Sequence, residues 1–189
     1  LTPIALTRPR ALRSHLLPGL VLGVLYFGGI TLQGWGMEYT RASNAAFVTG
    51  LSVVFVYAIE VLLGKARVSW RLLSALALAL AGLYLMSFSG SLEMMLGDAI
   101  VLSGSLCWAL QYIAVDRVAK SDLLSLVYLE NFFTAVLAAA LTPLARTPGP
   151  SELSGTLLPL TYLAVVCTIG ANTLQIYGQR WVSSVCLLY

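Results

Sequence analysis

The chain has 189 residues, of which 59% are hydrophobic and only 10% are charged, and its formal net charge is +3. An average soluble domain carries about 25% charged residues, so this composition cannot cover a surface that faces water. The sequence also lacks the basic patch with interleaved aromatic residues that a nucleic-acid-binding surface needs. We therefore exclude nucleic acid as a partner and expect the chain to be surrounded by a lipid bilayer.

Six apolar stretches follow one another along the chain, and each is about as long as a membrane crossing. A hydrocarbon core about 30 Å thick needs about 20 apolar residues in a helix, and soluble helices of that length would show a polar face. The sequence therefore predicts an all-α, polytopic membrane protein built as a helical bundle. The predicted spans are Leu16–Met37, Ser43–Gly64, Trp70–Phe88, Met95–Val115, Leu123–Leu144 and Gly155–Gly178, and a seventh is predicted to begin near Val182.

Basic residues gather on alternate sides of these spans, which predicts their direction. Because the connections are short, successive spans are expected to run antiparallel, and loops facing the cytoplasm carry an excess of Lys and Arg. One side has Arg8, Arg10, Arg13, Lys65, Arg67, Arg71, Arg117, Lys120 and Arg180, whereas the other has only Arg41 and Arg146. Residues 1–15 are therefore predicted to be cytoplasmic and the first span to run outward.

A nine-residue pattern occurs twice, at the end of the first span and at the end of the sixth. Residues 28–36 read GGITLQGWG and residues 170–178 read GANTLQIYG, so both fit GxxTLQx(W/Y)G. Five spans separate the copies, and an odd number places them upside down relative to each other. Inverted repeats of this kind are typical of secondary transporters. Completing the repeat requires ten helices, so both ends are expected to lie inside a longer protein.

Several junctions resemble the EamA-type family of the drug/metabolite transporter superfamily. Residues 36–47 resemble the family's junction between helices three and four, and Gly97-Asp98 through Trp108-Ala109 resembles the start of its second repeat. Arg117 closes that helix as a basic residue does in the family, and residues 179–184 resemble the second copy of the junction. Arg41 departs from the small residue that is usual at its position.

The resemblance implies inverted five-helix repeats, with helices three to eight and the start of nine present. Residues 1–92 would hold the last three helices of the first repeat, and residues 93–189 the first three of the second plus the start of the next. It also implies a secondary transporter that exports a small organic metabolite, such as an amino acid, across a bacterial inner (plasma) membrane. A homodimer is left open.

Glu130 is the most informative side chain, because it lies about 12 Å into its span at about 1.5 Å per residue. A carboxylate near a helix centre costs roughly 2.5–3.5 kcal/mol on insertion scales. It is therefore expected to face a polar cavity or a partner, and Asn131 and Thr134 are close enough in sequence to help. One interpretation is a contact with substrate or a coupled proton, and the other is a polar tie between helices or a shorter span that leaves Glu130 near the interface. Glu60 is closer to a span end and is expected to reach Lys65 or Arg67.

Two further sets of side chains could line a solute cavity. Trp108, Gln111 and Tyr112 share one helical face in the middle of a span, although buried packing explains them equally well. Asn172 and Gln175 share another face, as do Tyr26 and Gln33 two turns apart. The repeat makes Gln33 and Gln175 a pseudo-equivalent pair, which would either face each other across the binding site or tie helices together. Asn44 is expected to begin or cap its helix.

Other classes of function receive less support from the residues. Cys107, Cys167 and Cys186 stand singly, so no metal site, cofactor or disulfide framework is predicted, and no Walker A motif is present. An intramembrane enzyme needs a nucleophile beside a base, but His15, the single histidine, lies at a span edge and Glu130 has no second carboxylate near it. We expect no enzymatic activity. A channel or a non-transporting membrane subunit remains the alternative to a transporter.

Overall fold

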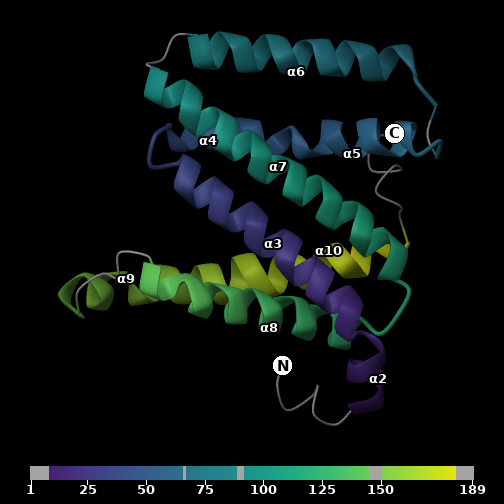
Figure 1. Ribbon diagram of the computed structural model, residues 1–189, viewed down its shortest axis with the longest axis vertical. Coiled ribbons are helices and arrows are strands. Elements are labelled where there is room, and N and C mark those ends of the chain that lie inside the picture. Colours follow the sequence, from purple (N-terminus) through teal and green to yellow (C-terminus); the bar gives the residue numbers. More distant parts are fainter. Residues whose placement is uncertain (1–8, 66, 89–91, 145–149, 182–189) are drawn as a thin grey trace. The chain divides into compact units, whose positions relative to one another are not determined.

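A computed structural model describes residues 9–65, 67–88, 92–144 and 150–181 of the chain, and no strand occurs among them (Figure 1). The α-helices are α2 (Pro9–Ser14), α3 (Leu16–Gly36), α4 (Ala42–Gly50), α5 (Ser52–Leu62), α6 (Trp70–Phe88), α7 (Leu92–Val118), α8 (Leu123–Leu141), α9 (Pro150–Tyr162) and α10 (Ala171–Gln179). A 3₁₀ turn, η1 (Thr142–Leu144), follows α8, and a π-helix, η2 (Leu163–Gly170), connects α9 to α10.

Five helical stretches are long and apolar enough to cross a membrane, which confirms the predicted polytopic helical fold. They are Leu16–Gly36, Ala42–Leu62, Met95–Val118, Leu123–Leu141 and Gly155–Gln179. The predicted span Trp70–Phe88 forms α6 with those same bounds, but its apolar stretch among the described residues is the shorter Leu73–Gly82. Its passage through the membrane stays a prediction, and the seventh span lies outside the described residues.

The chain divides into two compact units, and α3 and α7 each contribute to both. Unit 1 contains the described residues of Leu1–Phe27 and Ala114–Trp181, and unit 2 contains those of Gly28–Ile113. The two copies of the GxxTLQx(W/Y)G pattern therefore lie in different units, with residues 28–36 in unit 2 and residues 170–178 in unit 1.

Unit 1 is held together where the first half of α3 lies against α8. A Cβ at Gly23 would lie 2.7 Å from Cβ of Phe133, and one at Gly19 would overlap the side chain of Leu129, so each position has room for glycine alone. Small residues spaced four apart let membrane helices approach closely. Because the pairs 19–129 and 23–133 advance together, α3 and α8 run parallel, as the predicted alternation of spans requires.

The core of unit 1 brings in α10 and the end of α7. Leu22, Val115, Ala119, Leu126, Val127 and Ile176 form one buried apolar cluster. At the end of α10 the guanidinium of Arg180 donates from Nε to the carbonyl oxygen of Ala119 at 2.7 Å and from a terminal nitrogen to that of Ser121. These bonds join the end of α10 to the loop that follows α7.

Unit 2 is built around α7. The second half of α3 lies on it so closely that a Cβ at Gly36 would be 2.8 Å from the carbonyl oxygen of Gly97. Helix α4 packs on the same helix through Ala45, Val48 and Val101, and the Ser105 hydroxyl donates to the carbonyl oxygen of Val48 at 2.8 Å. Helix α5 adds a third contact through Val56, Ala109 and Ile113.

Candidate functional site

Glu130 lies in the interior of unit 1 and its side chain is 0% exposed. The α3 backbone passes directly beside it, because a Cβ at Gly23 would be 3.0 Å from the Glu130 carbonyl oxygen. Thr134 joins the two helices by donating from its hydroxyl to the carbonyl oxygens of Glu130 at 2.8 Å and Gly23 at 3.2 Å. Glu130 therefore lies where α3 and α8 approach closely, and its carboxylate is inside unit 1.

The expected helpers of this carboxylate have other partners. Asn131 donates from Nδ2 to the carbonyl oxygen of Val127 at 2.8 Å, and Thr134 bonds to the main chain as described. Both side chains reach back one helical turn, which is the local bond that short polar side chains favour in a helix. The prediction that Asn131 and Thr134 support the Glu130 carboxylate is therefore wrong for this structure.

Asn172 is placed at the level of Glu130 by the register between α8 and α10. The bonds of Arg180 and the cluster that joins Ile176 to Leu126 show that these helices run antiparallel. One turn before Ile176 lies Asn172, and one turn after Leu126 lies Glu130. The Asn172 side chain is 3% exposed, and its Nδ2 has no hydrogen-bond partner among the described residues.

Tyr26 is a third buried polar residue of this region, and the sequence paired it with Gln33 on one face of its helix rather than with Glu130. It follows Gly23 by three residues and so shares the face of α3 that lies on α8, and it is 4% exposed. The glycine spacing Gly19-xxx-Gly23 could have revealed this face from the sequence. We call Tyr26, Glu130 and Asn172 the polar layer of unit 1.

Gln175 also belongs to unit 1, but its side chain is directed along α10. Its Nε2 lies 3.5 Å from Oε1 of Gln179 one turn later, and Gln179 is buried. The predicted pairing of Gln175 with Gln33 is not tested, because Gln33 belongs to unit 2.

The remaining predicted residues lie on α7 and α3 within unit 2. The Trp108 ring covers the backbone of α3, since a Cβ at Gly29 would be 2.8 Å from its Cε2. Gln111 is fully buried, and Tyr112 packs against the cluster that joins α5 to α7. Gln33 is half-buried, one turn along α3 from Gly29. Packing therefore accounts for one face of Trp108 and for Tyr112, while a role in binding stays a prediction for all four residues.

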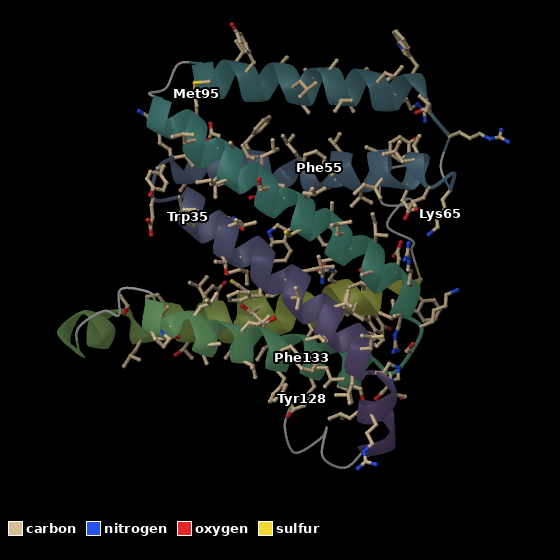
Figure 2. The ribbon with its side chains drawn as sticks, in the orientation of Figure 1. Trp35, Phe55, Lys65, Met95, Tyr128 and Phe133 are labelled. Atoms are coloured by element: carbon tan, nitrogen blue, oxygen red, sulfur yellow. The ribbon has the colours of Figure 1, made fainter. Side chains whose placement is uncertain are left out.

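Three other polar residues show what the sequence did and did not reveal. Glu60 is buried, and its Oε1 lies 3.7 Å from Nζ of Lys65, which confirms the expected pair. Figure 2 labels Lys65 beyond the end of α5. Asn44 does not cap α4, because the N-cap is Arg41 and no side chain caps this helix end. Asn44 is instead buried within the first turn of the helix. The sequence analysis also missed Asp98, which is 4% exposed and accepts a 2.6 Å hydrogen bond from the Thr40 hydroxyl.

Metal coordination has no evident place in the described part of the chain. No group of three or more His, Cys, Asp or Glu side chains comes together there. The polar layer of unit 1 offers a carboxylate, an amide and a phenol, which suit hydrogen bonding to an organic solute.

The fold and these buried polar groups define a multi-pass helical membrane protein. Comparison with known proteins makes the class more specific, because the family model described as the EamA-like transporter family matches residues 1–88. This match confirms the resemblance predicted from the sequence for residues 1–88, which are similar to that family. The assignment of the chain's helices to positions three to nine stays a prediction.

Curated relatives of this chain are named as transporters as well. A protein of Archaeoglobus fulgidus named as an uncharacterized transporter is 29% identical over 169 residues, covering 88% of this chain and 53% of its own length. A second from the same organism is 27% identical over 84% of this chain and 58% of its own length. The uncharacterized transporter YyaM of Bacillus subtilis is 28% identical over 58% of this chain and 38% of its own length. The chain spans about half the length of the first two relatives, and no solved structure matches it.

Proposed function

We propose that the protein is a secondary transporter that moves a small organic metabolite, such as an amino acid, out of the cell across the plasma membrane. The single observation that carries the proposal is the polar layer, in which Glu130 is 0% exposed in the middle of a helix apolar enough to span a membrane. Such residues normally mark a substrate or ion pathway. The names of the family and of the relatives favour the same class.

The chemistry of the polar layer suits a solute with both an amine and an acceptor oxygen. The Glu130 carboxylate accepts hydrogen bonds from a cationic amine, and these charge-assisted bonds are the strong ones. The Asn172 Nδ2 donor has no partner among the described residues, and an unmet buried donor costs about 1–3 kcal/mol. A carboxylate or carbonyl oxygen of the solute would remove that cost.

Alternating access is the mechanism that inverted repeats support. The two halves of the intact protein would rock about the solute and open the site to one side at a time. In this proposal Gln33 and Gln175, as pseudo-equivalent positions, and Trp108, Gln111 and Tyr112 form further parts of the cavity wall. The repeat boundaries at residues 92 and 93 belong to the same proposal.

A screen for tolerance tests the function in cells. The full-length gene is expressed in bacteria that are challenged with toxic amino-acid analogues and other small polar amines. An exporter raises tolerance to at least one of them, and Glu130→Gln should abolish that gain because the carboxylate charge is lost. The matched control is Glu38→Gln, the same chemical change at an exposed position after α3. Equal tolerance with Glu130→Gln and wild type would remove Glu130 from the site.

A further inference from the structure

We propose that unit 1 carries a binding site for one anionic phospholipid of the cytoplasmic leaflet. The site is a groove of about 250 Å³ between the start of α3 and the end of α7, lined by Leu17, Pro18, Val21, Leu22, Ala114, Arg117 and Val118. All of these residues belong to unit 1, and none is part of the polar layer.

The groove exists because two of its walls carry short side chains. Pro18 stands in the first turn of α3, where a proline is tolerated because its missing N–H would have no helical partner. Across from it, Ala114 offers only a methyl group. Leu17 and Val21 complete the wall and are 71% and 43% exposed, so an apolar surface is open to the surroundings. An apolar surface of this kind suits an acyl chain.

Charge complementarity decides which lipid fits. Arg117 is exposed at the mouth of the groove, and among the described residues it makes no ion pair. Lys120 follows one turn later, and Arg13 precedes Leu17 by four residues at the end of α2. All three belong to the side predicted to be cytoplasmic, where basic pockets between membrane helices bind anionic headgroups.

The open shape of the groove favours a lipid chain over a transported solute. Sites for drug-sized molecules bury most of the ligand, whereas this groove is open along one side. One acyl chain would lie along Leu17 and Val21 while its phosphate meets Arg117. The occupant is therefore a phospholipid with a net negative headgroup, and a zwitterionic lipid with the same chains should bind more weakly.

Native mass spectrometry of the purified protein in detergent can test the site directly. Phosphatidylglycerol and phosphatidylcholine with identical acyl chains are added in parallel, and the lipid-bound fractions are compared. We expect wild type to prefer phosphatidylglycerol, Arg117→Gln to lose about fivefold of that preference, and Arg117→Lys to retain most of it. The control Arg71→Gln removes another exposed basic residue on the same predicted side and should leave the preference unchanged.

Two further arms separate a lipid site from a simple anion site. Val21→Trp fills the groove and should reduce binding of both lipids, whereas inorganic phosphate added to wild type should displace neither. An unchanged preference in Arg117→Gln, unchanged binding in Val21→Trp, or displacement by phosphate alone would overturn the proposal. If Val21→Trp fails to fold, as shown by gel filtration, the Arg117→Gln result decides by itself.

Discussion

At the residue scale, most buried polar side chains have a partner within the protein, and a few have a polar atom without one among the described residues. Glu60 has Lys65, Asp98 has Thr40, and Ser105 has the carbonyl oxygen of Val48. Asn172 is as deeply buried as these but leaves its Nδ2 donor without a partner among the described residues. A water molecule or a solute can supply the acceptor for this donor.

The contact between Trp108 and Gly29 gives a prediction about stability. Gly29→Ala places a methyl group 2.8 Å from the indole ring, and overpacking of this kind costs about 1–3 kcal/mol. Alanine is otherwise the better helix former, so a loss of stability would come from the contact alone. Thermal unfolding in detergent, followed by gel filtration of the remaining folded protein, should show a lower Tm.

Gly34 provides the control for that substitution within the same helix. A Cβ at Gly34 meets nothing within 4 Å, so Gly34→Ala should leave the Tm unchanged or raise it. Equal Tm values for Gly29→Ala and Gly34→Ala would show that Trp108 moves aside without cost, and its packing role would then be discarded.

At the element scale, Arg180 connects the end of α10 to the end of α7. Its two hydrogen bonds reach the carbonyl oxygens of Ala119 and Ser121, and bonds to charged groups contribute about 1.5–3 kcal/mol each. Arg180→Ala should therefore loosen the last turn of α7. Hydrogen exchange of the amides of residues 114–121 should become faster, while exchange in the first half of α8 changes little.

Lys120 tests whether that effect comes from capping or from charge. It is exposed and has no hydrogen bond or ion pair among the described residues, so Lys120→Ala removes a positive charge from the same loop without removing a cap. Exchange should stay at the wild-type rate in this variant. Faster exchange in both variants would assign the effect to the loss of charge.

Helix positions could be predicted well from the sequence because hydropathy reports the length of an apolar helix. The bounds of α6 agree at both ends, and α3 ends one residue before the prediction. Two local features could not be predicted in this way. The second span is divided into α4 and α5 at Leu51, and residues Leu163–Gly170 form a π-helix, where the Thr168 hydroxyl donates to the carbonyl oxygen of Leu163 five residues earlier.

In the candidate site, hydropathy predicts which polar residue is buried, but helix packing determines which residues surround it. Burial of Glu130 follows from a carboxylate placed in an apolar span, since exposure to lipid is costly. The choice of its neighbours depends on which helices approach closely, and that depends on Gly19 and Gly23. Tyr26 was therefore paired with Gln33 rather than with Glu130, and the side chains of Asn131 and Thr134 bond to the main chain instead of to the carboxylate.

At the scale of the whole molecule, the direction of the spans follows from the basic residues and agrees with packing inside each unit. Within unit 1, α3 and α8 run parallel, and α8 and α10 run antiparallel. Within unit 2, α3 and α7 run antiparallel. These directions are the ones expected when successive spans cross the membrane in alternate directions. They are the same whichever side of the membrane is cytoplasmic.

Labelling of single cysteines tests which side of the membrane is cytoplasmic. In a variant whose native cysteines are replaced, Ser121→Cys lies on the predicted cytoplasmic side and Arg41→Cys on the opposite side, and both positions are exposed. A membrane-impermeant maleimide added to intact cells should label Arg41→Cys alone, and lysis should make Ser121→Cys reactive. Labelling of both positions in intact cells would contradict the alternation, and the reverse result would invert the orientation.

Flux through the purified, reconstituted full-length protein tests the central proposal most directly. Vesicles loaded with the solute identified in the tolerance screen are diluted into buffer that contains labelled solute. Counterflow of the label is measured at increasing concentrations of external solute. We expect counterflow that saturates, that Glu38→Gln preserves, and that Glu130→Gln weakens roughly tenfold to hundredfold in apparent affinity. Flux that rises linearly without saturation, or that is identical in Glu130→Gln and wild type, would contradict a solute site built on the polar layer.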